Sequence, residues 1–96
     1  MTEASLDSAI RQGLGLLAAR PDLAEAQAQE ILAVVPGHPA GLLMRGAARR
    51  RMGRSKEALG DLAPLAASQP TWPPAHLELG LARGEAGDPR GAVEAL

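Results

Sequence analysis

Apolar residues recur along the first third of the chain at the spacing of amphipathic helices. The first stripe consists of Leu6, Ala9, Ile10, Gly13, Leu14 and Leu17. The second stripe consists of Ala24, Ala28, Ile31, Leu32 and Val35. Each stripe predicts one helix, because an i, i+3, i+4, i+7 spacing places its residues on a single face. The second helix is predicted to open with a capping box formed by Asp22 and Glu25, and to end at Pro36.

Glycine and proline mark the limits of the next two helices. A third helix is predicted from about residue 40 to 52, ending at Gly53, which readily adopts the left-handed conformation of a C-cap. Ser55 is predicted to cap a fourth helix. The apolar stripe of this helix consists of Ala58, Leu59, Leu62, Leu65 and Ala66. Pro64 predicts a kink in it, because proline cannot donate a hydrogen bond to the carbonyl of Gly60.

The last third of the chain repeats the same signals. A fifth helix is predicted to begin at Pro73 or Pro74 and to end near Gly87. Asp88 followed by Pro89 predicts the start of a sixth, with a capping carboxylate before a proline at the first helical position. Six helices joined by short turns predict an all-α fold.

The chain also matches itself at a shift of 34 residues. Of the 27 residue pairs that join 36–62 to 70–96, nine are identical. The identical pairs are Pro36 with Pro70, Pro39 with Pro73, Leu43 with Leu77, Gly46 with Gly80, Ala48 with Ala82, Arg49 with Arg83, Gly53 with Gly87, Ala58 with Ala92, and Leu62 with Leu96. A period of this length is typical of helical repeat proteins.

At this spacing the chain resembles tetratricopeptide repeats. The second unit shows Leu42, Gly46, Gly53, Ala58, Leu62 and Pro70 at the family positions. The third unit shows His76, Leu79-Gly80, Gly87, Ala92 and Leu96. The sequence departs from the family at Arg45, where Leu is usual, and at Arg49 and Arg83, where Tyr is common.

The resemblance implies an α-solenoid of antiparallel helix hairpins in one domain, residues 1–96. It would hold about three repeats: an atypical first one (5–36), a second (39–70), and a third (73–96) that is incomplete. Small residues at Gly46, Gly80, Ala58 and Ala92 are expected where two helices cross closely.

Composition and charge exclude several classes of function. The chain has 10 basic and 11 acidic residues and a net charge of −1, which gives no general attraction to nucleic acid or to an anionic membrane. It has no cysteine, so disulfides and thiolate metal sites are excluded. The longest uncharged run, Ile31 to Met44, is interrupted by proline and too short to span a bilayer. We therefore expect a soluble cytoplasmic protein without a cofactor.

In the resembled family, extended peptides bind a concave groove lined by the first helix of each unit. The positions implied for this chain are Ala9, Gly13 and Leu16 from the first unit, Ala40, Leu43, Ala47, Arg50 and Arg51 from the second, and Pro74, Leu77, Leu81, Gly84 and Glu85 from the third. Family members that hold the terminal carboxylate of a chaperone use Lys and Asn on this face. Leu43, Ala47, Leu77 and Leu81 stand at those places here, so we expect recognition of apolar or mixed peptides.

Basic residues are concentrated in the middle of the chain. Residues 31 to 56 contain no acidic residue and six basic ones, namely Arg45, Arg49, Arg50, Arg51, Arg54 and Lys56. One interpretation is a basic patch, centred on Arg45, Arg49 and Arg54, that binds an acidic peptide or a phosphate. The other is structural: these arginines pair with Glu57, Asp61, Glu78 or Glu85, or lie solvated over helix stems. The sequence leaves both open.

Catalytic and metal chemistry have no support in the sequence. His38 and His76 are isolated and lack the partners of a zinc site. The serines have no neighbouring His and carboxylate, so no nucleophilic triad is indicated. No aromatic side chains alternate with the arginines to stack nucleic-acid bases. Trp72 is interpreted as a contact between adjacent units or, alternatively, as a ligand contact.

The sequence thus predicts a non-catalytic module for protein–protein interaction, with a peptide or protein in the groove. Two alternatives stay open. The uncovered end at Val93 and Leu96 could join two copies of the chain into a homo-oligomer. The chain could also be the amino-terminal appendage of a larger bacterial enzyme, because bacterial proteins with similar repeats often carry a catalytic domain, sulfotransferase-type among them.

Overall fold

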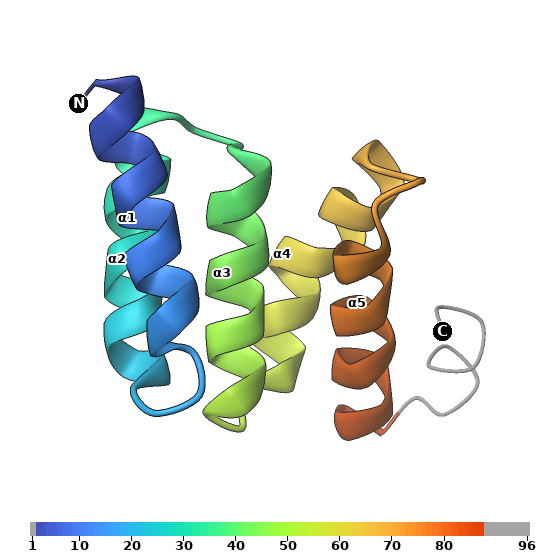
Figure 1. Cartoon of the computed structure of the whole chain (residues 1–96). Helices are drawn as coiled ribbons and strands as arrows, with labels where there is room; N and C mark the ends of the chain where they lie inside the picture. The colour runs from blue at the N-terminus through green and yellow to red at the C-terminus, as the bar shows by residue number, and fades with distance from the viewer. Residues whose placement is uncertain (1, 88–96) are drawn as a thin grey trace.

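The computed structural model describes residues 2–87, which form five α-helices and no strand. The helices are α1 (Glu3–Leu16), α2 (Pro21–Val34), α3 (Pro39–Arg51), α4 (Ser55–Ser68) and α5 (Pro73–Glu85). Each helix packs against the next, and the chain direction alternates from one to the next (Figure 1). This arrangement confirms the predicted all-α solenoid of antiparallel hairpins. The sixth helix and the residues assigned to it, Ala92, Val93 and Leu96, lie outside the described residues.

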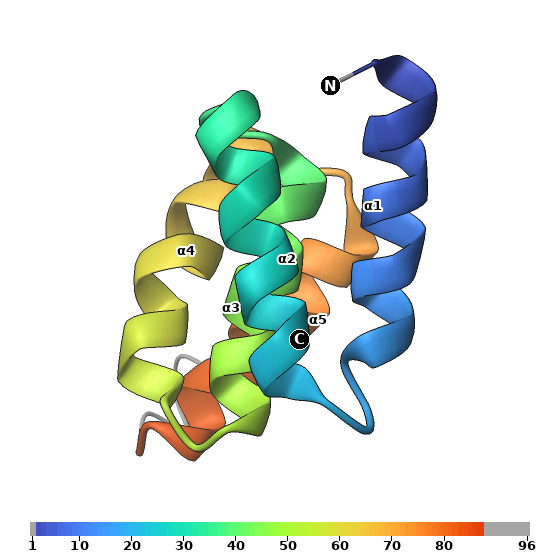
Figure 2. The ribbon, with the colours of Figure 1, turned by 90° about the vertical axis from the view of Figure 1, so that its left-hand side faces the viewer.

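The first helices of successive hairpins lie side by side. α1 contacts α3, and α3 contacts α5. In Figure 1, α2 lies behind α1 and α4 lies behind α3. Figure 2, turned by 90°, shows α1 and α4 on opposite sides of the molecule. The α1, α3 and α5 side chains that do not face a partner helix therefore share one surface.

Proline and glycine set the limits of the helices much as the sequence predicts. Pro21, Pro39 and Pro73 each occupy the first turn, where the missing amide proton costs nothing. Gly53 and Gly87 follow α3 and α5 with φ of 80° and 88°, a left-handed conformation that favours glycine. The two glycines are 34 residues apart, so the turn chemistry follows the repeat.

Two predicted caps are wrong. The N-cap of α2 is Arg20, whose guanidinium binds the Asp22 carboxylate (Nη2 to Oδ2, 2.9 Å), so no capping box forms. The N-cap of α4 is Arg54, which places Ser55 inside the helix. The Ser55 hydroxyl donates instead to Glu85 on α5 at 3.1 Å. In α2 the guanidinium of Arg20 binds the carboxylate that was expected to cap the helix. In α4 the carboxylate of Glu85 binds the hydroxyl that was expected to do so.

The core is built from small side chains and aliphatic residues in two clusters. One, between α4 and α5, comprises Ala58, Leu62, Leu65, Ala66, Ala75, Leu79 and Ala82. The other, between α1, α2 and α3, comprises Ala9, Ala24, Ala28, Ile31, Met44 and Ala48. Gly46 allows the close crossing of α3 and α4, because a Cβ atom there would lie 2.5 Å from Cδ2 of the fully buried Leu62. The prediction of a small residue at this crossing is confirmed.

Candidate functional site

An apolar pocket lies on the surface shared by α1, α3 and α5. Its volume is about 300 Å³, and its lining residues are Leu17, Leu43, Ala47, Pro73, Pro74, Leu77 and Glu78. Leu17 directly follows α1, Leu43 and Ala47 come from α3, and the others from α5. Leu77 is 51% exposed, the highest value among the large apolar residues in the described part of the chain. We call this site the apolar pocket.

A second, more polar hollow lies toward the C-terminal ends of the same helices. Its volume is about 600 Å³, and its lining residues are Ala18, Pro21, Arg50, Arg51, Gly53, Ser55 and Glu85. We call it the polar hollow. Arg51 is four residues after Ala47 on α3, which is about 6 Å along the helix axis. Together the apolar pocket and the polar hollow form the groove.

An ion-pair cluster joins the two parts of the groove. Arg50 donates from Nε to Glu78 Oε2 at 2.8 Å and from Nη1 to Glu85 Oε1 at 2.9 Å. The Arg50 and Glu78 side chains are 12% and 15% exposed. Burial opposes the charge of Arg50, but its hydrogen bonds to Glu78 and Glu85 outweigh this and raise its pKa. The cluster fixes α5 against α3 at the groove.

Other arginines turn away from the groove, toward α2 and α4. Arg45 donates to both carboxylate oxygens of Asp61, at 2.7 Å for the Nη2–Oδ1 pair, and Arg49 reaches Asp61 Oδ2 at 3.2 Å. Arg49 and Arg54 both donate to Glu25 at 2.8 Å. We call these five residues the outer network. Arg54 also binds the exposed carboxylate of Glu57.

Charge pairing in the outer network stabilises the ionised forms of its members. Hydrogen bonds from Arg54 and then Arg49 lower the pKa of Glu25, although partial burial opposes the shift. The hydrogen bond to Asp61 raises the pKa of Arg45. The guanidinium groups of the predicted basic patch, Arg45, Arg49 and Arg54, are therefore held by carboxylates of the same chain.

Comparison with known proteins identifies the architecture. No family model and no curated protein matches the chain. Among solved structures, the crystal structure of the Sgt2 TPR domain from Aspergillus fumigatus superposes with a TM-score of 0.86 at 28% sequence identity. The match covers 95% of this chain and 61% of that one. The chain is built from tetratricopeptide-type repeats. A sulfotransferase-type domain attached to these repeats stays a prediction from the sequence.

The tetratricopeptide-type packing determines which predicted groove residues come together. Leu43, Ala47 and Leu77 line the apolar pocket, and Arg50, Arg51 and Glu85 line the polar hollow. Leu81 is partly buried and lines neither part. In the first repeat, Ala9 and Gly13 are buried and Leu16 is partly buried, and none of the three lines either part.

Sequence reasoning missed three lining residues of the apolar pocket, Leu17, Pro73 and Glu78. It also missed four of the polar hollow, Ala18, Pro21, Gly53 and Ser55. Leu17 was detectable, since it precedes Arg51 by 34 residues and Arg51 precedes Glu85 by 34. All three residues hold the same place in their repeats. Because Arg51 and Glu85 were assigned to the groove, the repeat also predicts Leu17 there.

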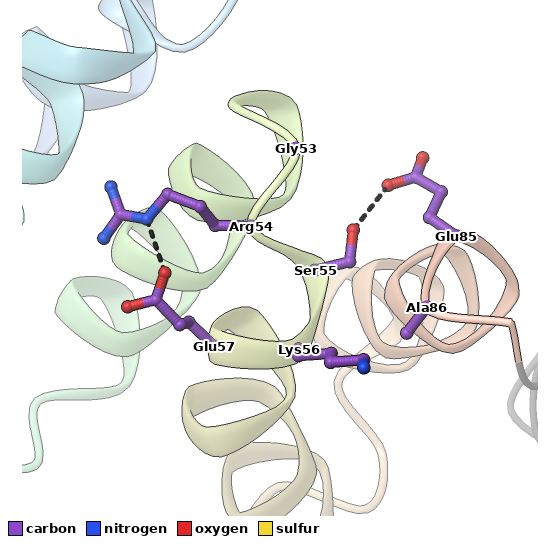
Figure 3. A pocket seen from close by; sticks show the side chains of 7 residues that line it. All are labelled: Gly53, Arg54, Ser55, Lys56, Glu57, Glu85 and Ala86. Atoms are coloured by element: carbon purple, nitrogen blue, oxygen red, sulfur yellow. Dashed lines mark hydrogen bonds and ion pairs between the residues drawn. The ribbon is translucent and has the colours of Figure 1, made fainter.

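A third hollow of about 270 Å³ lies at the turn between α3 and α4 (Figure 3). Its lining residues are Gly53, Arg54, Ser55, Lys56, Glu57, Glu85 and Ala86. Figure 3 shows Arg54 bound to Glu57 and Ser55 bound to Glu85, so most of its polar groups are engaged within the protein. Only the exposed Lys56 keeps an uncommitted charge there among the described residues.

The two histidines and Trp72 have local structural contacts. His38 caps α3, because its Nδ1 accepts a hydrogen bond from the Ala40 amide at 3.1 Å. His76 donates from Nε2 to the Pro70 carbonyl at 2.9 Å. Trp72, the residue before α5, is half-buried against the core cluster of α4 and α5.

Within residues 2–87 no group of three or more His, Asp or Glu side chains is arranged to hold a metal ion. None of the five helices has the length and apolarity to cross a bilayer.

Proposed function

We propose that this chain is a non-catalytic module that binds an extended segment of a partner protein in the groove formed by α1, α3 and α5. The apolar pocket carries the proposal. Six of its seven lining residues are apolar, and Leu77 leaves half of its side chain in water. Repeat proteins of this architecture use their extended concave surfaces for binding.

The dimensions of the surface suit an extended peptide. Neighbouring helices pack about 8–10 Å apart, so three first helices span about 20 Å. An extended chain advances about 3.3 Å per residue, so about six ligand residues would cross the surface. One apolar side chain of the ligand would fill the pocket between Leu43 and Leu77, and burial of such a side chain contributes about 2 kcal/mol.

Recognition of a terminal carboxylate is not favoured at this pocket. The positions that carry Lys and Asn in carboxylate-holding relatives are Leu43, Ala47, Leu77 and Leu81. Three of them line the apolar pocket, where they would remove a carboxylate from water without a hydrogen-bond donor. The groove is therefore proposed to bind an internal segment through side chains.

Peptide display tests this proposal without a known partner. A random library of about twelve residues is panned on the 96-residue chain, and each binder is titrated against two variants. Leu77→Glu places a charge in the apolar pocket and is expected to weaken binding more than tenfold. Leu23→Glu is the matched control: Leu23 is 43% exposed on α2 and lies outside the groove.

Circular dichroism checks that both variants keep the helical content of the parent. Binders that lose affinity equally with both variants, or with neither, would place the binding surface elsewhere and refute the assignment of the groove. Failure to recover any binder to the parent chain would count against the function itself.

A further inference from the structure

Glu78 is an unusual member of the apolar pocket. It is the one charged residue among the seven that line it, and its side chain is 15% exposed. A carboxylate that is largely removed from water is disfavoured unless it is paired. Arg50 provides that pairing, but only to Oε2 of Glu78.

The surrounding cluster has more negative charge than it neutralises. Arg50 contributes one positive charge, and Glu78 and Glu85 contribute two negative ones, which leaves one net negative charge. Three of the four carboxylate oxygens accept hydrogen bonds: Glu78 Oε2 and Glu85 Oε1 from Arg50, and Glu85 Oε2 from Ser55. Glu78 Oε1 is the one without a donor among residues 2–87. It is not sealed from water, because no buried side-chain oxygen in this part of the chain lacks a partner.

We propose that the groove selects partner segments in which a cationic side chain lies next to an apolar one, and that Glu78 recognises the cation. This inference rests on the proposed function of the groove. A Lys or Arg side chain suits the site, since its methylene stem lies beside the apolar ligand side chain that fills the pocket while its charged end donates to Glu78. A charge-assisted hydrogen bond is stronger than a neutral one, and partial burial of Glu78 limits screening by solvent.

Arg51 defines the competing possibility. It is exposed in the polar hollow, about 6 Å along α3 from Ala47, and has no carboxylate partner in the described part of the chain. An acidic partner would be drawn to Arg51 rather than to Glu78. Charges of exposed side chains are largely screened at physiological salt, so the less exposed Glu78 is expected to dominate.

The test starts from a display-selected peptide whose binding depends on Leu77. An alanine scan locates its apolar anchor. The residue two positions after the anchor, whose side chain faces the same side of an extended chain, is then replaced by Lys, Gln or Glu in three otherwise identical peptides. Fluorescence anisotropy gives Kd for each at two salt concentrations. We expect the Lys peptide to bind about tenfold more tightly than the Glu peptide at low salt, with the Gln peptide between them.

The variant Glu78→Gln is expected to reduce that difference to about threefold or less and to keep the affinity for the Gln peptide, since Gln still accepts a hydrogen bond from Arg50. Glu57→Gln is the matched control. It removes the same charge from a carboxylate that binds Arg54 outside the groove, and should preserve the full difference.

The outcomes separate the two proposals. Tighter binding of the Glu peptide, especially if Arg51→Ala removes it, would overturn the role of Glu78 and leave the groove as the binding site. Full discrimination by Glu78→Gln would also overturn that role. If no Leu77-dependent peptide is recovered, both proposals fail. The peptide order on the parent chain decides the charge preference even if Glu78→Gln folds poorly.

Discussion

Both faces of α3 carry arginines that bind carboxylates, but the two sets of ion pairs differ. On the outer face, Arg45 and Arg49 meet carboxylates whose four oxygens, on Glu25 and Asp61, all accept hydrogen bonds. On the groove face, Arg50 meets Glu78 with one oxygen left open beside an apolar pocket. The outer network is complete within the chain, whereas the groove cluster can accept a further donor.

The geometry of the helix explains how adjacent arginines reach opposite faces. Successive residues of an α-helix are about 100° apart around the axis. Arg49 therefore points toward α2 and α4, and Arg50 points toward α5. A basic run that reads as one patch in the sequence is two separate ion-pair systems in the fold. The outer network and the groove cluster both contain charged residues. They differ in whether every carboxylate oxygen already accepts a hydrogen bond.

Among the changes that test this difference between the two faces, replacement of the buried Asp61 should have the largest effect on stability. Asp61 is 5% exposed and serves both Arg45 and Arg49. Asp61→Asn keeps the shape but leaves Arg45 without its carboxylate, and should lower the free energy of unfolding by about 2–3 kcal/mol, as for loss of charged hydrogen bonds. Urea denaturation followed by circular dichroism measures it.

Peptide affinity at temperatures well below unfolding should be unchanged by Asp61→Asn, because the outer network is separate from the groove. Asp22→Asn, at the exposed Arg20–Asp22 pair, is the control and should leave the urea midpoint unchanged. A folded Asp61→Asn protein with parental stability but weaker peptide binding would reverse the assignment of the two faces.

Acid should weaken the outer network by a smaller, graded amount. The pKa of Glu25 in the folded chain is lowered below its ordinary value of about 4.5 by Arg54 and Arg49. The unfolded chain therefore binds the proton first, and the stabilisation by Glu25 is complete above about pH 5 and lost as pH falls through the folded pKa.

A Glu25→Gln variant isolates this contribution. It should be less stable than the parent at pH 7, and the difference should shrink on acidification, because a protonated glutamate resembles glutamine. Urea midpoints at pH 7, 5, 4 and 3 measure the convergence. A difference that stays constant over this range would mean that Glu25 stabilises the fold without its charge.

The sequence predicts the fold well because the repeat places proline and glycine where helices begin and end. Pro39 and Pro73 start equivalent helices, and Gly53 and Gly87 end them, at positions where few other residues fit. Gly46 faces Leu62 for an equally local reason, since two backbones cannot approach closely past a side chain.

The chemistry of the groove is less accessible to sequence reasoning. The repeat makes Glu78 equivalent to Met44, which is fully buried in the core, so the period gives no sign that Glu78 lines a pocket. Its partner Arg50 is 28 residues away, and only the packing of α5 on α3 brings them together. The cap predicted at Ser55 failed for a similar reason, since Glu85, 30 residues away, takes its hydroxyl.

The smallest effect on stability is expected from a substitution in the apolar pocket, which tests whether the groove face contributes to the fold. Leu77→Ser should change the free energy of unfolding by less than about 0.5 kcal/mol, because the side chain is already 51% exposed. Leu79→Ser, two residues away and 5% exposed, should cost about 3 kcal/mol through the cavity and the buried hydroxyl. Thermal and urea unfolding compare the pair. A loss above about 1.5 kcal/mol for Leu77→Ser would make Leu77 a packing residue. A near-neutral result would mean that the fold leaves this leucine in water without relying on it, as a binding surface requires.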